Sequence, residues 1–281
     1  MSDLHSFNEA VNARAGRKLF PSIAVGLGLM ALIWSSLAFE RTIFAFLVAF
    51  ALVLAVRELS QAFTSVGFTN SFRALALGTV AISLSTWFAG INGLAIATAT
   101  SFTAIVLVSL HHGTENFVKR ASSTALALTY LPLLGGFIIL IARPSNGLAA
   151  VMTFLLIIGC NDTFGYIVGV LIGKHPLAPS ISPKKSYEGL IGSLVGTMVG
   201  GGLTFHYILE SDYRYGIVTG LVIVFTATSG DLIESAMKRD MSIKDMGTIL
   251  PGHGGMLDRI DSAIFSAPAF YLALELVKRL S

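Results

Sequence analysis

"GLAAVMTFLLIIGCNDTFGYIVGVLI", residues 147–172, is a continuous apolar run in which Asp162 is the only charged side chain. A helix rises about 1.5 Å per residue, so a run of this length is about 39 Å long. The hydrocarbon core of a bilayer is about 30 Å thick, and about 20 apolar residues are enough to cross it. The length and the lack of charge therefore predict a membrane-spanning helix.

The rest of the chain has the same character. Of its 281 residues 54% are hydrophobic and only 12% are charged, and the mean hydropathy is +0.75. Soluble domains carry about 25% charged residues. The apolar runs are continuous and do not alternate with polar residues, which argues against a transmembrane β-barrel. We therefore predict an all-α, polytopic membrane protein.

We expect about nine transmembrane helices, separated by short polar links. The predicted spans are residues 20–39, 42–57, 73–89, 92–110, 122–142, 147–172, 189–209, 215–235 and 260–280. Two regions follow from this division. Residues 1–150 form an N-terminal transmembrane region of about five spans, and residues 151–281 form a C-terminal catalytic region with cytosolic loops at 173–189 and 236–259.

The distribution of positive charge predicts the orientation, because Lys and Arg are enriched on the cytosolic side of membrane proteins. With a cytosolic N-terminus, fourteen of the nineteen Lys and Arg residues fall inside, and nine spans place the C-terminus outside. The run at 20–39 has no clear cleavage site, so we expect it to be retained. Cys160 is the single cysteine, which excludes an intrachain disulfide.

Acidic residues gather at the inner ends of the last two spans. In "TSGDLIES", residues 228–235, a helix would place Asp231, Glu234 and Ser235 on one face. Asp258 and Asp261 are three residues apart where the last span begins. Carboxylates and hydroxyls are hard oxygen ligands that suit Mg²⁺. The alternative is that these acids are solvated helix ends paired with nearby Lys and Arg.

Basic residues and a glycine-rich turn accompany these acids. Lys184 and Lys185 follow "SISP" in one cytosolic loop, and Lys238 and Arg239 follow Asp231 in the other. Their side chains could neutralise phosphate oxygens, although cytosolic positive charge can also serve topology alone, as we expect for Lys119 and Arg120. In "PGHGG", residues 251–255, glycines permit positive φ and backbone contact with an anion.

Polar groups also occur inside the sixth span, where Asn161 and Asp162 are adjacent. Ionisable side chains at membrane depth are rare and usually face a cavity or a partner. We expect that arrangement here, with packing of Asp162 against a neighbouring helix as the alternative.

Two blocks of sequence resemble one known family. The pattern runs from Ser235, Lys238 and Arg239 through Lys244 and Asp245 to "PGHGGMLDRID", residues 251–261, and resembles the signature of the phosphatidate cytidylyltransferases, or CDP-diacylglycerol synthases. "NDTFGYIVGVLIGKHPLAPSISPKKSYEG", residues 161–189, is similar to the family's other cytosolic block. Ser186 and Phe164 depart from its usual residues without removing a charge. The resemblance covers roughly residues 155–265.

The resemblance implies transfer of CMP from CTP to phosphatidic acid with Mg²⁺, at the inner face of the bacterial cytoplasmic membrane. In this interpretation the metal ligands are Asp231, Ser235, Asp258 and Asp261, and the catalytic residues are Asp231, Asp258, Asp261, Lys238 and Arg239. The substrate-binding residues are Ser182, Lys184, Lys185, Lys244, His253, Gly254, Gly255 and Arg259.

The implied partners are CTP, phosphatidic acid and bilayer lipid, without nucleic acid, and a homodimer is left open as the assembly. Two other functions fit part of the pattern. A cation- or proton-coupled transporter would use Asp162 and Asp231 but leaves the glycine-rich turn and the basic pairs without a role. A CTP transferase acting on another lipid phosphate would use all of them.

Overall fold

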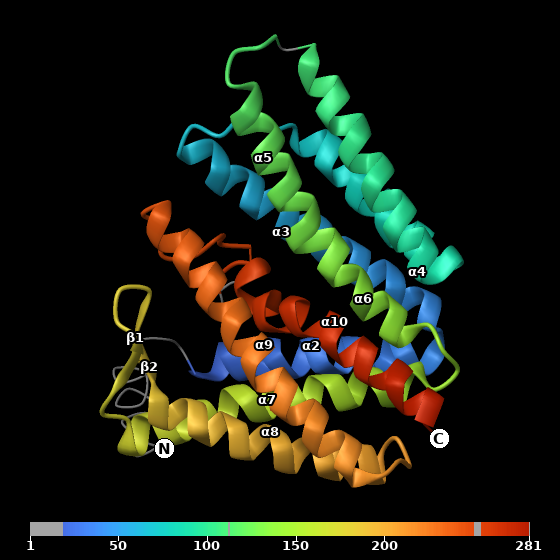
Figure 1. Ribbon diagram of the computed structural model, residues 1–281, viewed down its shortest axis with the longest axis vertical. Coiled ribbons are helices and arrows are strands. Elements are labelled where there is room, and N and C mark those ends of the chain that lie inside the picture. The colour runs from blue at the N-terminus through green and yellow to red at the C-terminus, as the bar shows by residue number, and fades with distance from the viewer. Residues whose placement is uncertain (1–18, 112, 250–253, 281) are drawn as a thin grey trace.

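The computed structural model of the chain describes residues 19–111, 113–249 and 254–280. The predicted all-α class is confirmed, since helices make up most of the described chain (Figure 1). In chain order the elements are α2 (Leu19–Phe39), α3 (Arg41–Ser65), α4 (Phe72–Leu110), α5 (Phe117–Leu128), the π-helical η1 (Thr129–Leu133), α6 (Leu134–Ala142), α7 (Gly147–Ile172), β1 (Pro176–Ala178), β2 (Ser182–Ser186), α8 (Tyr187–Tyr207), α9 (Tyr213–Asp240) and α10 (Leu257–Leu280).

The helices form two groups joined by α10. Helices α3, α4, α5 and α6 pack together in the upper part of Figure 1, and α7, α8 and α9 pack together in the lower part. Helix α10 lies between them and contacts both α9 and α6. Small residues permit close helix contacts: a Cβ at Gly201 of α8 would collide with the backbone of Gly216 in α9.

Within the described residues, six helices are long and apolar enough to cross a membrane. They are Arg41–Ser65, Phe72–Leu110, Phe117–Ala142, Gly147–Ile172, Tyr213–Asp240 and Leu257–Leu280. Each of the nine predicted spans overlaps a helix, but length and composition support six, so the count of nine stays a prediction.

Helix α4 contains a reversal that explains part of this difference. Gly90 has non-helical angles (φ 64°, ψ −143°), which glycine adopts without strain. A Cβ at Gly78 would lie 3.3 Å from Cβ of Ser101, so the two halves of α4 pack against each other. The carbonyls that the turn exposes are partly satisfied by Arg143, whose Nε donates to Trp87 O (2.9 Å). The predicted spans 73–89 and 92–110 correspond to these halves.

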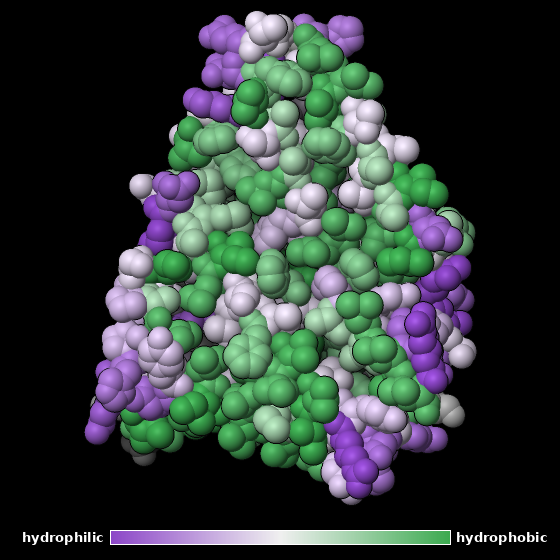
Figure 2. Space-filling view, in the orientation of Figure 1, coloured by the Kyte–Doolittle hydropathy of each residue, from purple (hydrophilic) through white to green (hydrophobic). Residues whose placement is uncertain are grey.

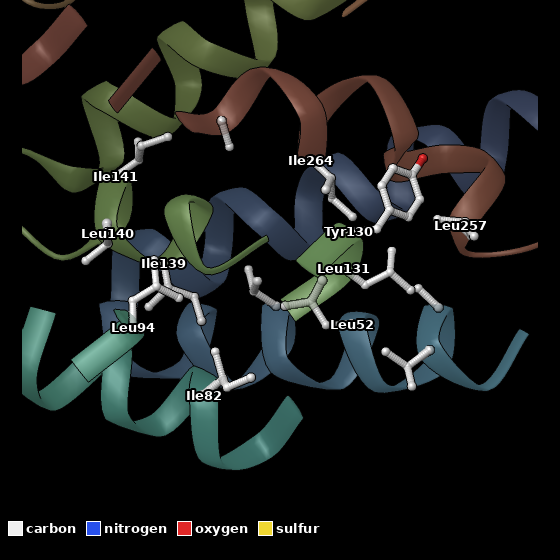
Figure 3. Packing of buried hydrophobic residues seen from close by; sticks show 14 of the residues in the cluster. Leu52, Ile82, Leu94, Tyr130, Leu131, Ile139, Leu140, Ile141, Leu257 and Ile264 are labelled. Carbon is white, nitrogen blue, oxygen red and sulfur yellow. The ribbon is translucent and has the colours of Figure 1, made fainter. Parts of the chain in front are cut away.

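A continuous apolar core fixes the N-terminal group of helices. Leu52 of α3, Ile82 and Leu94 of α4, Leu131 of η1 and Ile139 of α6 are each at most 1% exposed (Figure 3). The π-helical turn η1 contains Pro132, which has no N–H to donate to the helical ladder. The turn begins at Thr129, next to Tyr130, whose position matters for the site described below.

The outer surface of the helices is apolar, as expected for contact with lipid. Large hydrophobic side chains are exposed along one face of α8, including Val195, Val199 and Leu203. Figure 2 shows an extensive hydrophobic surface, with hydrophilic residues gathered towards its margins. An integral membrane protein is therefore supported by both the helices and their surface.

Residues that the charge pattern assigns to one side of the membrane do lie near one another. Arg41 donates to the carbonyl oxygen of Arg143 (2.9 Å). With a cytosolic N-terminus, the predicted spans place both the link after residue 39 and the link after residue 142 outside. Arg239 Nε donates to the carbonyl oxygen of Ile181 (3.2 Å), and both were assigned inside. The grouping agrees with the predicted topology, while the side that faces the cytosol remains a prediction.

Candidate active site

Three carboxylates meet where α9 and α10 cross. One oxygen from each of Asp231, Glu234 and Asp261 lies within 4.8 Å of the others, and we call these residues the acid cluster. Helical spacing brings Asp231 and Glu234 to one face of α9, as predicted. The two helices approach closely at Gly230, where a Cβ would lie 2.8 Å from Asp261 O. The cluster could hold a divalent cation.

Glu234 and Asp261 are only 1% and 9% exposed. Glu234 Oε1 is buried and has no hydrogen-bond partner among the described residues. A buried carboxylate oxygen without a donor is costly, because its water is lost without replacement. A cation ligated by the cluster would satisfy it. Ser235 Oγ donates to Asp231 Oδ1 (3.3 Å), so the predicted hydroxyl lies beside the cluster.

Lys238 connects the acid cluster to the start of α10. Its Nζ lies 2.6 Å from Glu234 Oε2 and 2.8 Å from Asp258 Oδ1, and its side chain is 16% exposed. The second oxygen of Asp258 accepts from the N–H groups of Gly255 (2.8 Å) and Met246 (3.1 Å). Asp258 therefore binds Lys238 and the backbone of the loop. Among the carboxylates, the predicted metal ligands differ from the acid cluster by Asp258 in place of Glu234.

The predicted cytosolic loop at 173–189 contains a two-stranded antiparallel hairpin, β1–β2, which pairs Pro176 with Ser186 and Ala178 with Ser182. Three prolines gave no strand signal in the sequence, and only the absence of helix was predicted there. Lys185 of β2 forms an ion pair with Asp231. Together with the Arg239–Ile181 contact, this places the hairpin against the end of α9.

Glu188, in the first turn of α8, fixes the base of the hairpin. Its Oε1 lies 2.6 Å from His175 Nδ1, and its Oε2 accepts from the N–H groups of Lys174 (3.1 Å) and His175 (3.2 Å). The hydrogen bond from the His175 side chain, with those from the backbone, lowers the pKa of Glu188 to about 2. Glu188 is therefore ionised throughout the neutral range.

A cavity of about 400 Å³ lies between α7, α8, β2 and α9. Its polar lining includes Asn161, Asp162, Lys184, Lys185 and Asp231, and its apolar lining includes Tyr166, Val170 and Leu190. Asn161 and Asp162 were expected to face a cavity or a partner, and both line this cavity. Asn161 Nδ2 donates to Asp162 Oδ1 (2.9 Å). Asp231 belongs both to this lining and to the acid cluster, so the cavity and the cluster are adjacent.

The remaining predicted residues surround this centre. Ser182 begins β2, Lys244 is exposed in the loop after α9, and Arg259 lies in the first turn of α10. Gly254 has φ +79°, the positive φ expected of the glycine-rich turn, and Gly255 donates its N–H to Asp258. His253 lies outside the described residues. The roles of all these residues stay predictions.

Two residues of the N-terminal region reach this centre and were missed from the sequence. Glu58 of α3 is 1% exposed and binds the backbone at the start of α10. Tyr130 of η1 is 4% exposed, and its hydroxyl has no hydrogen-bond partner in the described part of the chain. Figure 3 shows that hydroxyl pointing towards α10, between Leu257 and Ile264. Glu58 was readable as an acid inside an apolar helix, but the predicted span ended one residue before it.

Comparison with known proteins gives a consistent result. Residues 21–277 match the model of the cytidylyltransferase family. The chain is 34% identical to the phosphatidate cytidylyltransferase of Mycobacterium leprae (strain TN), over 94% of this chain and 90% of that protein. The corresponding protein of Mycobacterium tuberculosis (strain ATCC 25618 / H37Rv) is 34% identical over 94% and 85%. That of Staphylococcus haemolyticus (strain JCSC1435) is 33% identical over 83% and 88%.

Proposed function

The chain belongs to the cytidylyltransferase family, and we propose from this premise that it transfers CMP from CTP to phosphatidic acid, releasing pyrophosphate and forming CDP-diacylglycerol. The observation that carries the proposal is the meeting of the acid cluster, the basic hairpin and the cavity around one residue, Asp231. The transporter alternative is not favoured, because it gives these basic residues no task.

We propose that Asp231, Glu234 and Asp261 hold Mg²⁺. The donor set fits: three carboxylates can each offer an oxygen to one point, and one buried oxygen of Glu234 has no donor of its own in the described residues. When bound, Mg²⁺ supplies positive charge to triphosphate oxygens. Ser235 supports the site through Asp231, and Asp258 acts through Lys238 and the loop backbone.

The cavity fits the phosphate of a membrane lipid. Its polar side offers the ammonium groups of Lys184 and Lys185, and its apolar side is formed by α7 and α8. Tyr166 and Val170 of α7 are 71% and 66% exposed. A lipid lying along these helices could keep its acyl chains in the bilayer while its phosphate enters the cavity. CTP would then approach from the other side of the acid cluster, near Arg239, Lys244 and Arg259.

The reaction joins two anions, so the residues of the site must reduce their repulsion and align them. An oxygen of the lipid phosphate forms a bond to the α-phosphorus of CTP, and the bond between that phosphorus and the bridging oxygen to the β-phosphate breaks. Pyrophosphate leaves with the electron pair. Lys185 can exchange Asp231 for a substrate phosphate, because its ion pair already lies between the cavity and the cluster. The lipid phosphate is deprotonated at neutral pH, so no general base is required.

We place the protein in the bacterial cytoplasmic membrane with this site facing the cytosol. The charge bias and the membrane-forming helices support this placement. The expectation of a homodimer can be tested by light scattering on the purified protein in detergent.

The activity is tested by incubating the purified full-length chain with CTP labelled on the cytosine, Mg²⁺ and phosphatidic acid in detergent micelles. Label should move into the organic phase only when phosphatidic acid is present. Polyprenyl phosphate and an archaeal-type ether-lipid phosphate should be poorer acceptors. Labelling of one of these lipids in preference to phosphatidic acid would assign the other substrate class.

A further inference from the structure

Glu58 is a buried carboxylate of the N-terminal region that binds the backbone of the catalytic region. Its Oε1 accepts from the N–H of Met256 (3.0 Å) and its Oε2 accepts from the N–H of Leu257 (2.9 Å). These are free N–H groups at the start of α10, which a helix cannot satisfy internally. A carboxylate at this end also interacts favourably with the helix dipole.

The segment that Glu58 binds is the one that carries two proposed site residues. Asp258 and Asp261 lie in the first turns of α10, and Asp258 accepts from the N–H of Gly255. Glu58 and Asp258 thus bind three successive backbone N–H groups from residue 255 to residue 257. A shift of this segment would move Asp258 and Asp261 together relative to α9.

Two glycines of the loop between α9 and α10 leave the room that the Glu58 side chain occupies. A Cβ at Gly255 would lie 2.6 Å from Glu58 Oε2, and one at Gly247 would lie 2.7 Å from Glu58 Cγ and closer still to its carboxyl group. All three nearest atoms to a Cβ at Gly247 belong to Glu58. The loop and the carboxylate are therefore fitted to each other.

We propose that Glu58 is a positioning residue for the cytidylyltransferase reaction: from α3 it fixes the start of α10 so that Asp258 and Asp261 face α9. The proposal rests on the proposed function for the roles of those two acids. Burying a carboxylate such as that of Glu58 in an apolar helix costs free energy. A short polar side chain just before α10 could bind the same N–H groups without that cost. The distant carboxylate does more than a local cap, because it ties the N-terminal helices to the reacting centre.

The first test compares Glu58→Gln with Glu40→Gln. Gln keeps the size of the side chain but has one acceptor oxygen, so one of the two N–H groups loses its partner. Glu40 caps the other end of α3 and is exposed, which makes it a matched control. We expect Glu58→Gln to lower kcat by about tenfold or more, as small displacements of catalytic groups do, with a smaller change in KM for CTP. Glu58→Asp, which keeps the charge, should retain more activity than Glu58→Gln.

A second readout does not depend on the reaction. In a Cys160→Ser background, a cysteine at the exposed position Thr248 reports loop opening through its rate of reaction with a maleimide. Glu58→Gln should raise this rate several-fold, and Glu40→Gln should leave it unchanged. If the parent chain lacks the activity, the proposed function fails. The labelling rates still test whether Glu58 holds the start of α10 in place.

A double-mutant comparison tests the contact between Glu58 and Gly247. Gly247→Ala alone should lower kcat by about tenfold, because the new methyl group displaces Glu58. In a Glu58→Ala background the same change should cost little more. The proposal is supported if the losses for Gly247→Ala and Glu58→Ala are not additive and if Glu58→Gln lowers kcat and speeds labelling. Unchanged labelling in Glu58→Gln, unchanged kcat, or independent losses for Gly247→Ala and Glu58→Ala would each overturn it.

Discussion

Glu234 belongs to the acid cluster and also binds Lys238. Its replacement tests whether its carboxylate is a ligand of the proposed metal site. Glu234→Gln keeps the volume of a side chain that is 1% exposed but removes its charge. We expect the Mg²⁺ concentration for half-maximal activity to rise by about tenfold or more, since a lost ligand weakens the cation site. Titration of activity with Mg²⁺ measures this. Glu275→Gln, at the exposed Glu275–Lys278 pair, is the control. An unchanged Mg²⁺ titration would remove Glu234 from the metal site.

Replacement of Lys184 and Lys185 tests whether they bind substrate phosphate or only set the membrane topology. Replacing both with Gln should lower kcat/KM for CTP or phosphatidic acid by about ten- to a hundredfold for each lost charge-assisted contact. The Arg pair should fall between the Gln pair and the parent. Lys174→Gln removes a charge from the same loop and serves as the control. Equal kcat/KM in the Gln pair and the parent, on equal amounts of inserted protein, would leave both lysines with a topological role.

For individual residues, the sequence predicted contacts between positions close in the chain and missed contacts between distant positions. The pairs Asp231–Ser235 and Asp258–Asp261 follow from helical spacing alone. Glu58 could not be connected to Leu257 from one sequence, because 199 residues separate them and only packing brings them together. The exchange of Asp258 for Glu234 in the acid cluster depends on how α9 and α10 cross, which spacing within one helix does not determine.

Among the elements, the reversal within α4 depends on Gly90. Its φ is positive and a Cβ would lie 2.9 Å from Arg143 Nη1, so Gly90→Ala combines backbone strain with displacement of the end of the Arg143 side chain. We expect destabilisation of about 1–3 kcal/mol, seen as a lower Tm in detergent. Gly113→Ala, at positive φ but in open space, should lower Tm less, and Gly159→Ala, in open space without positive φ, should change it little. Equal Tm values for all three would exclude a special role for Gly90.

The helices were predictable because long apolar runs are unambiguous. Every predicted span overlaps an observed helix. The hairpin was not, because Pro176, Pro179 and Pro183 suppress both helix and strand signals. Contacts from outside the hairpin stabilise it, including those of Lys185 with Asp231 and of His175 with Glu188. The π-helical turn η1 likewise has no periodic signature beyond Pro132.

For the whole molecule, the central structural prediction is that the hairpin and the loop after α9 face the cytosol. A cysteine at Ser180 in a Cys160→Ser background should react with an impermeant reagent only after the inner side is made accessible. A cysteine at Ser211, between α8 and α9 on the side assigned outside, should react in intact cells. Labelling at position 180 in intact cells would reverse the orientation. The charge bias predicts orientation, but helices packed together do not by themselves distinguish the two sides.

The most direct test of the function follows both ends of CTP at once. CTP carries one label on the α-phosphate and another on the γ-phosphate, and the full-length protein is given phosphatidic acid and Mg²⁺. We predict that the α-label appears in the extracted lipid and the γ-label in pyrophosphate, in equal molar amounts, and that Asp261→Asn abolishes both. Transfer of the γ-label to lipid, or release of phosphate without labelled lipid, would contradict cytidylyl transfer.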